Sequence, residues 1–309
     1  MSNYLVTGVA GFIGSHVAQK LLVTGNKVLG IDNFNPVLYG DLQKKDRLKD
    51  LLPNKNFNFI EDDLLDMELD LILSKIDYII NEAGLPGQHK SWNQISEYFN
   101  ANTIATARLF DAASRSNVKG FLQASTSSVY GNNAIGIEDQ SLNPASPYGV
   151  SKLAAENLIK AMTPYSSMKT VILRYFSVYG PSQRPDMGMF KFFEAIREDR
   201  PINVYGDGEQ TRDFTYVSDV VNATILSLEQ GLDGEIYNVS GGQQISINKL
   251  IELLEKTTNK KIEVIKVDRP KGDQLNTQAD TSKIRKYISW RPEIALEEGL
   301  SKQYFWHNN

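Results

Sequence analysis

Tyr148 and Lys152 are the two residues of this chain whose types and spacing most directly suggest chemistry. They stand four residues apart in Tyr148-Gly149-Val150-Ser151-Lys152, so both side chains lie on one face if the segment is helical. A free Tyr titrates near pH ~10 and is a poor base at neutral pH. A neighbouring cation stabilises the phenolate and lowers that pKa, so the pair could move protons near neutrality. The alternative is an exposed helix pair that arises by chance.

A Gly-rich turn near the start of the chain supports a redox interpretation. Gly8-Val9-Ala10-Gly11-Phe12-Ile13-Gly14 follows an expected strand at 4–7 and opens an expected helix at 13–22. Free N–H groups at a helix N-terminus favour a pyrophosphate, although the glycines alone could form an ordinary strand–helix turn. The expected strand at 27–31 ends at Asp32, where a carboxylate would accept hydrogen bonds from an adenosine ribose and repel a 2′-phosphate. The combination predicts NAD as cofactor and favours it over NADP.

Later strand ends extend the predicted cofactor site. Asp63-Leu64 follow the expected strand at 57–61 and would lie near the adenine, and Ala83-Gly84 follow the strand at 78–81 near the ribose and pyrophosphate. Both pairs could also be simple strand ends. The complete predicted cofactor set is Gly8, Gly11, Phe12, Ile13, Gly14, Asp32, Asn33, Asp63, Leu64, Ala83, Gly84, Asn102, Tyr148, Lys152 and Tyr175.

The elements that must position these residues alternate along the first two thirds of the chain. Short apolar runs alternate with helical patterns, which predicts βαβ units on a parallel sheet covered on both faces. The further expected strands are 120–125 and 170–175, and the further expected helices are 95–114 and 151–162. After Phe176 the pattern changes, with expected helices at 189–197, 247–257 (capped by Ser246) and 296–304, and a turn at 206–208.

Composition narrows the classes of function. The 309 residues are 41% hydrophobic and 23% charged, and a net charge of −4 argues against a broad nucleic-acid surface. The three His residues are scattered and Cys is absent, so no metal site or disulfide is predicted. No apolar run approaches the length of a membrane span, and no secretion signal is expected. A cytoplasmic protein is predicted, because a chain without Cys suits a reducing compartment.

The chain resembles the extended short-chain dehydrogenase/reductases. The resemblance rests on four features in sequence order: the Gly-rich turn, Asp32, Ser125-Thr126-Ser127-Ser128-Val129-Tyr130-Gly131 and the Tyr148/Lys152 pair. More narrowly, the chain is similar to the NAD-dependent nucleotide-sugar epimerases and dehydratases over essentially its whole length. The resemblance implies an α/β fold: a Rossmann-type doubly wound parallel sheet with a smaller C-terminal α/β substrate domain. We expect residues 1–176 to form the NAD-binding domain, a segment near 210–240 to return to it, and residues 177–309 to form mainly the substrate domain.

The resemblance also implies roles for individual residues. Tyr148 would be the base, Lys152 would hold the nicotinamide ribose and lower the Tyr148 pKa, and Thr126 would hydrogen-bond the sugar. Arg212 would bind the diphosphate of a UDP-sugar, with a surface ion pair to Asp213 as the alternative. Arg269 is displaced from the family position of a second such Arg. The predicted catalytic residues are Tyr148, Lys152 and Thr126, and the predicted substrate-binding residues are Thr126, Ser127, Ser128, Ser177, Arg184, Arg212 and Asp273.

The residues after Thr126 favour one reaction within the family. In that family the sugar is oxidised at C4 first. A dehydratase needs an acid and a base directly after the Thr, and a decarboxylase carries Glu where this chain has Ser128. With Ser127 and Ser128 there, the simplest outcome is rotation of the ketone and return of the hydride to its other face, which is 4-epimerisation.

The stretch from Ser177 to Met187 resembles that of UDP-glucuronate epimerases, whereas many UDP-glucose epimerases have Asn at the position of Ser177. A Ser177 hydroxyl and an Arg184 guanidinium would suit a sugar carboxylate. Holding that carboxylate would oppose loss of CO2 from the β-keto acid formed at C4. Alternatively, Arg184 faces a phosphate or the surface. The loop 86–92 is expected to border the sugar, although this loop and Asn81 depart from the family in detail.

UDP-glucuronate 4-epimerase is therefore the predicted activity. UDP-glucose or UDP-N-acetylglucosamine 4-epimerase is the alternative, followed by a UDP-glucuronate decarboxylase or a non-catalytic NAD sensor. Pairing of the helices at 95–114 and 151–162 across a two-fold axis, as in related homodimers, predicts a homodimer.

Overall fold

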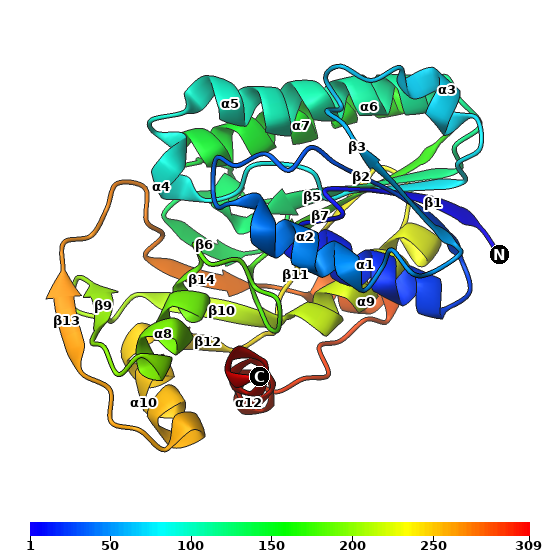
Figure 1. Cartoon of the computed structure of the whole chain (residues 1–309). Helices are drawn as coiled ribbons and strands as arrows, with labels where there is room; N and C mark the ends of the chain where they lie inside the picture. The colour runs from blue at the N-terminus through cyan, green and yellow to red at the C-terminus, as the bar shows by residue number, and fades with distance from the viewer.

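The computed structural model describes residues 1–309 and centres on a seven-stranded sheet (Figure 1). The strand order is β11-β7-β5-β4-β1-β2-β3, and every pairing is parallel. The order reverses between β1 and β4, where such sheets open a crevice at the carboxyl ends of their strands. The strands are β1 (Asn3–Thr7), β2 (Lys27–Asp32), β3 (Phe57–Glu61), β4 (Tyr78–Asn81), β5 (Gly120–Thr126), β7 (Lys169–Tyr175) and β11 (Glu235–Val239).

Helices cover both faces of this sheet (Figure 1). One face carries α1 (Phe12–Val23), α2 (Asp41–Lys49) and α9 (Val217–Gln230), and the other carries α3 (Leu69–Leu73), α5 (Ile95–Phe99), α6 (Ala105–Ser114) and α7 (Pro147–Met162). Successive strand residues therefore enter different cores: Tyr4 and Val6 belong to the cluster with α1 and α9, and Leu5 to the cluster with α3 and α6. The predicted doubly wound α/β fold is confirmed.

The segment 95–114 differs from the single regular helix that the sequence predicts. It is helical throughout, but a π-helical turn, η1 (Asn100–Ile104), separates α5 from α6. Such turns are rare in proteins, but those that occur are often at functional sites. Here the turn contains the buried Asn102.

Smaller sheets follow in the C-terminal part. β10 (Thr211–Tyr216) lies between β8 (Ser177–Tyr179) and β12 (Gln244–Ser246), β9 (Ile202–Tyr205) pairs with β13 (Val264–Val267), and β6 (Asn133–Gly136) pairs with β14 (Asn276–Ala279). The remaining helices are α4 (Gln88–Ser91), α8 (Gly188–Arg197), α10 (Ile247–Thr258), α11 (Ser282–Ile288) and α12 (Leu296–Asn308). The Ser246 hydroxyl accepts a hydrogen bond from the Lys249 N–H at 3.1 Å, so it caps α10 as predicted.

The chain crosses between its two parts more than once. After β10, α9 packs under the main sheet and β11 extends its edge beside β7 (Figure 1). α8, α10 and α12 lie together below the sheet in the same view. The domain boundary at residue 176 stays a prediction.

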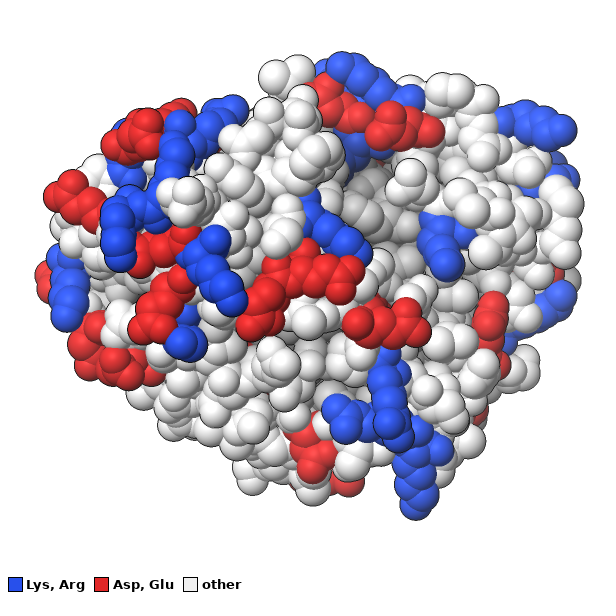
Figure 2. All heavy atoms as spheres, turned by 90° about the horizontal axis from the view of Figure 1, so that it is seen from below, with Lys and Arg blue, Asp and Glu red and all other residues white.

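The surface seen from below Figure 1 carries charges of both signs, interspersed without a broad positive region (Figure 2). None of the helices is both long enough and apolar enough to span a bilayer.

Candidate active site

Two cavities meet at Tyr148. The first, of about 260 Å³, extends from the Gly-rich turn and Asp32 to Lys152, and the second, of about 830 Å³, extends from Thr126 to Arg212. Tyr148, Tyr175 and Arg184 line both. All predicted cofactor residues line the first cavity, and all predicted substrate residues line the second. The geometry thus brings the predicted site together, while the individual roles stay predictions.

The Gly-rich turn forms a tight cradle at the start of α1. Gly8 has φ +64°, and a Cβ there would lie 2.8 Å from the Ala83 nitrogen. The Gly11 N–H donates to the Gly8 carbonyl at 2.9 Å, and a Cβ at Gly14 would overlap that same carbonyl. Side chains are excluded at these positions, so the N-terminus of α1 stays open to the first cavity. This fits the approach of a dinucleotide pyrophosphate.

Asp32 ends β2 with its carboxylate held by backbone donors. The Ala10 N–H donates to Oδ2 at 3.1 Å and the Phe34 N–H to Oδ1 at 2.9 Å. Burial raises the pKa of Asp32, while the Lys44 charge and these two N–H groups oppose the rise. Each oxygen keeps a lone pair for a ribose hydroxyl, so Asp32 also fits the predicted cofactor.

The ends of β2 and β3 are tied together beside Asp32. The Asn33 amide donates to Asp63 Oδ2 at 2.7 Å, and the Leu65 N–H donates to Asp63 Oδ1 at 2.9 Å. Leu64 between them is buried. These contacts shape the end of the cavity where the sequence predicts the adenine.

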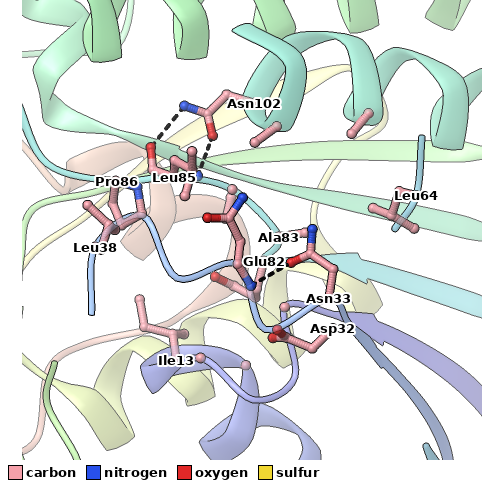
Figure 3. Close-up of a pocket in the computed structure, with 18 of the residues that line it drawn as sticks. Ile13, Asp32, Asn33, Leu38, Leu64, Glu82, Ala83, Leu85, Pro86 and Asn102 are labelled. Atoms are coloured by element: carbon pink, nitrogen blue, oxygen red, sulfur yellow. Dashed lines mark hydrogen bonds between the residues drawn. The ribbon is translucent and has the colours of Figure 1, made fainter. Parts of the chain in front are cut away.

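Asn102 connects the loop after β4 to α7. Its Oδ1 accepts from the Leu85 N–H at 2.7 Å, and its amide donates to the Leu85 carbonyl at 3.0 Å (Figure 3) and to Ser151 Oγ at 2.9 Å. A Cβ at Gly84 would lie 2.6 Å from the same Oδ1. Asn102 therefore fixes the backbone at the middle of the first cavity.

Tyr148 and Lys152 lie on the first turns of α7. Pro147 starts the helix, and Ser146 caps it by accepting from the Gly149 N–H at 3.2 Å. Burial raises the pKa of Tyr148, and hydrogen bonding with Thr126 and the positive charge of Arg184 oppose that rise. The lowering by Lys152 that the resemblance implies stays a prediction.

Burial also lowers the pKa of Lys152 to about 8, against the effect of the Glu82 and Glu156 carboxylates. The pKa of Lys152 therefore lies close to neutral pH.

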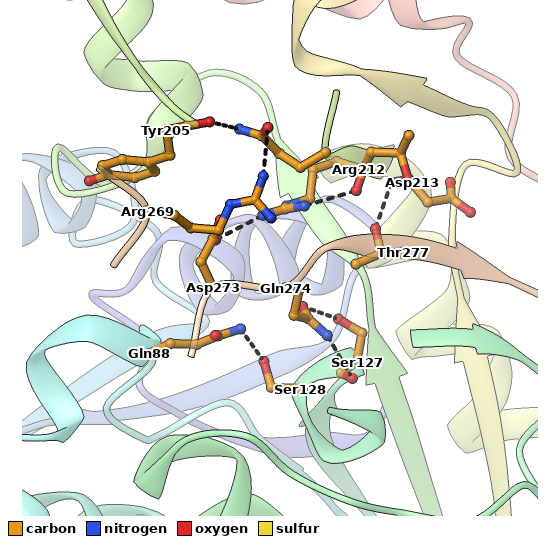
Figure 4. A network of polar contacts seen from close by, with 12 residues as sticks. Gln88, Ser127, Ser128, Tyr205, Arg212, Asp213, Arg269, Asp273, Gln274 and Thr277 are labelled. Carbon is orange, nitrogen blue, oxygen red and sulfur yellow. Dashed lines mark hydrogen bonds and ion pairs between the residues drawn. The ribbon is translucent and has the colours of Figure 1, made fainter. Parts of the chain in front are cut away.

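The segment after β5 turns its hydroxyls toward the second cavity. Thr126 Oγ1 accepts from the Ser128 N–H at 3.1 Å, and Ser128 Oγ accepts from the Gln88 amide at 3.1 Å. The Gln274 amide donates to the Ser127 carbonyl at 3.2 Å (Figure 4). Hydroxyl groups, rather than a carboxylic acid or an imidazole, occupy the positions next to Thr126.

Arg184 is buried between the two cavities. Its guanidinium donates twice to Asp186, from Nε to Oδ1 at 3.0 Å and from Nη2 to Oδ2 at 2.9 Å. Only 14% of the Arg184 side chain is exposed, so the surface alternative is wrong. Ser177, at the start of β8, is half-buried and lines the second cavity. A ligand carboxylate would meet a guanidinium that Asp186 already orients.

Arg212 forms an ion pair with Asp273, with Nη2 and Oδ1 2.8 Å apart (Figure 4). The alternative partner, Asp213, instead accepts hydrogen bonds from the N–H groups of Gly242 and Ala279. The alternative of an Arg212–Asp213 ion pair is therefore wrong. The other Asp273 oxygen is buried without a partner. Arg269 lies in the same polar network and donates to Gln210 Oε1 at 3.4 Å.

Gln88 belongs to the loop 86–92 that the sequence places beside the sugar; it lines the second cavity, and its Oε1 is buried without a partner. Sequence reasoning missed two other polar residues of the site. Asp186 orients Arg184, and Glu82 accepts a hydrogen bond from the Tyr175 hydroxyl at 2.7 Å. The signal for Glu82 was present, since a charged residue directly follows the expected strand at 78–81. No group of three or more His, Cys, Asp or Glu side chains is arranged to hold a metal ion.

This geometry agrees with comparisons to known proteins. Residues 4–240 match the model of the NAD dependent epimerase/dehydratase family, and the chain belongs to that family. It is 40% identical to a UDP-glucuronate 4-epimerase of Thermodesulfobacterium geofontis, over 99% of this chain and 96% of the relative. It is 39% identical to the uncharacterized UDP-glucose epimerase YtcB of Bacillus subtilis, over 97% and 96%.

The same fold is seen in a crystal structure of UDP-glucuronic acid 4-epimerase from Bacillus cereus in complex with UDP-glucuronic acid and NAD. The TM-score is 0.95 at 37% identity, and the match covers 99% of both chains.

Proposed function

We propose that this protein is an NAD-dependent UDP-sugar 4-epimerase that interconverts UDP-glucuronate and UDP-galacturonate. The observation that carries the proposal is the position of Tyr148, which borders both a cavity suited to a dinucleotide and a larger polar cavity. A sugar hydroxyl can lose its proton to Tyr148, and the carbon that carries it can lose its hydride to the cofactor, only where both cavities meet. The family membership and the relatives named above support this choice.

In the proposed reaction, Tyr148 takes the proton of the sugar C4 hydroxyl, and Thr126 orients that hydroxyl. Bound NAD would supply the redox chemistry by accepting the C4 hydride and returning it to the opposite face of the ketone. Tyr148 then returns the proton, so the sugar and the enzyme end the cycle with no net change of oxidation state. Lys152, charged below its lowered pKa of about 8, stabilises negative charge on the phenolate.

Ser127 and Ser128 support epimerisation over elimination or decarboxylation. Both are buried and both line the second cavity, and their hydroxyl groups are too weakly acidic or basic to remove a proton from carbon. With no acid–base pair next to Thr126, the ketone has one simple outcome, which is rotation and reduction from its other face.

Ser177 and Arg184 support a substrate with a carboxylate at C5. Both line the second cavity, and Arg184 is buried next to Tyr148. A charge-assisted hydrogen bond to the substrate would fix the carboxylate and disfavour its release as CO2. UDP-glucose is the second candidate, because the ion pair with Asp186 already neutralises Arg184.

A kinetic comparison of UDP-sugars tests this proposal. Purified protein supplied with NAD should convert UDP-glucuronate to UDP-galacturonate with a higher kcat/KM than it converts UDP-glucose. A UDP-pentose as the main product would identify a decarboxylase instead. Turnover of UDP-glucose alone would remove the role given to Ser177 and Arg184.

We further propose that the protein acts in the cytoplasm as a homodimer. Apolar side chains on α5, η1 and α7 support the dimer, because Ile95 is 50%, Ile104 47% and Val150 42% exposed. A molar mass near 69 kDa, about twice that of one chain (34.7 kDa), is expected in light scattering. A mass of one chain at micromolar concentration would contradict it.

A further inference from the structure

Glu82 is a charged residue of the first cavity that the mechanism above does not use. It directly follows β4, is half-buried and lines the cavity together with Lys152. Its Oε1 accepts a hydrogen bond from the Tyr175 hydroxyl at 2.7 Å. That hydroxyl also lies 2.7 Å from Thr224 Oγ1, which donates to the Val220 carbonyl at 2.8 Å. These polar contacts tie the Glu82 carboxyl through Tyr175 of β7 to Thr224 of α9.

Three titratable groups face Glu82. Tyr175 approaches from β7, and Lys152 and Tyr148 approach from α7. Lys152 also faces Glu156, and Tyr148 also faces Arg184. The Glu82 carboxylate raises the pKa of both Lys152 and Tyr148. Its own pKa is raised by burial to about 7, although Tyr175 and Lys152 oppose that rise.

Such a carboxyl group weakens folding at neutral pH. A Glu that ionises more readily in the unfolded chain than in the fold costs stability as pH rises through its folded-state pKa. The cost of burying this carboxyl group therefore favours a functional role for Glu82 over a packing role.

We propose that Glu82 is a positioning residue that acts through Lys152 and Tyr175. Its carboxylate keeps the buried Lys152 in the ammonium form and holds the Tyr175 hydroxyl at the boundary between the two cavities. The inference rests on the proposed function, because the ammonium matters only where Tyr148 must lose and regain a proton.

Removing the charge of Glu82 should shift the pH dependence in one direction. In Glu82→Gln, Lys152 loses its proton at lower pH, because the carboxylate that favours its ammonium form is gone. Tyr148 also ionises at lower pH, so both limbs of the kcat profile move toward acid. We expect each limb to shift by about 1 pH unit. A role in packing alone would reduce kcat without moving either limb.

The experiment compares kcat profiles of the NAD-loaded wild type with Glu82→Gln, Glu82→Asp and Glu252→Gln. Glu82→Asp keeps the charge and should return both limbs toward the wild-type positions. Glu252 is an exposed residue of α10, its side chain 64% exposed, and its variant should match the wild type. Unmoved limbs in an active Glu82→Gln protein would overturn the inference.

Thermal unfolding between pH 5 and 8.5 gives a readout that does not depend on turnover. The wild-type fold binds a proton at Glu82 that its unfolded chain has already released, so its stability falls relative to Glu82→Gln as pH rises. The Tm of Glu82→Gln minus that of the wild type should therefore increase with pH, whatever its starting value. A pH-independent difference would overturn the inference. If the wild type turns over no UDP-sugar, the proposed function fails, and this thermal comparison still tests whether the fold holds Glu82 with a raised pKa.

Discussion

At the scale of single residues, the site separates oxidation from the fate of the ketone. Tyr148 and Lys152 lie on one helix face where the two cavities meet, and their surroundings act on both pKa values. Thr126 ends β5, and Ser127 and Ser128 come directly after it. All three contribute only hydroxyl groups to the sugar side. The proposed chemistry therefore depends on which groups are absent next to Thr126 as much as on those present.

The Tyr148→Phe substitution removes the proposed base and keeps the ring. We expect kcat to fall by about 10²–10⁴-fold, because proton transfer then lacks a positioned group. Affinity for UDP should be unchanged, which isothermal titration can check. Tyr165→Phe is a matched control, since that ring is 91% exposed and should leave kcat unaltered. Equal activity of the two variants would exclude Tyr148 as the base.

The Ser177→Asn substitution tests recognition of the sugar carboxylate. Loss of one charge-assisted hydrogen bond should lower kcat/KM for UDP-glucuronate by about 10–100-fold. Turnover of UDP-glucose should fall less or rise, so the ratio of the two substrates is the quantity to measure. An unchanged ratio would show that Ser177 does not contact the C5 substituent.

At the scale of elements, much of the fold could be predicted from the sequence. In β4, apolar residues stand at successive positions because both faces of the sheet are covered, and predicted and observed bounds agree at 57–61 and 78–81. The pairing of β6 with β14 joins residues 133–136 to 276–279. Local patterns contain no information about such distant partners. The Asp186 partner of Arg184 was missed because nothing in the sequence distinguishes it from a solvated charge.

The π-helical turn was equally invisible, because periodicity over 95–114 is that of an ordinary helix. Its effect is nevertheless specific: Asn102 makes three hydrogen bonds that hold Leu85 and Ser151. The functional part of this segment therefore depends on a local irregularity that residue types alone do not reveal.

Asn102→Ala tests that element directly. The buried Leu85 N–H would lose its acceptor, so the free energy of unfolding should fall by about 2–3 kcal/mol. Affinity for NAD should fall as well, because the loop at Ala83-Gly84 borders the first cavity. Chemical denaturation and titration with NAD measure the two effects. Asn93→Ala, at an exposed position nearby, is the control. Similar losses in both variants would contradict the role given to the Asn102 hydrogen bonds.

At the scale of the whole molecule, an acidic protein must bind a diphosphate with local positive charge. The net charge is −4, and the second cavity contains Arg212 and Arg184, each paired with an Asp. These pairs orient both guanidinium groups. The polar network around Arg212 connects β10 to the segment before β14 (Figure 4).

Arg212→Met should weaken UDP binding by about 10–100-fold, because a charge-assisted contact to phosphate is lost. Isothermal titration with UDP measures this without turnover. Arg291→Met, at an exposed position after α11, should bind UDP as the wild type does. Equal affinities of all three proteins would exclude Arg212 from the diphosphate site.

The most direct test of the proposed reaction follows the hydrogen at C4. UDP-glucuronate that carries deuterium at C4 is incubated with the NAD-loaded protein, and the products are examined by NMR and mass spectrometry. The account predicts UDP-galacturonate that retains the deuterium at C4, without net NADH and without a UDP-pentose. Loss of the deuterium to solvent, or a UDP-pentose as the main product, would contradict 4-epimerisation at Tyr148.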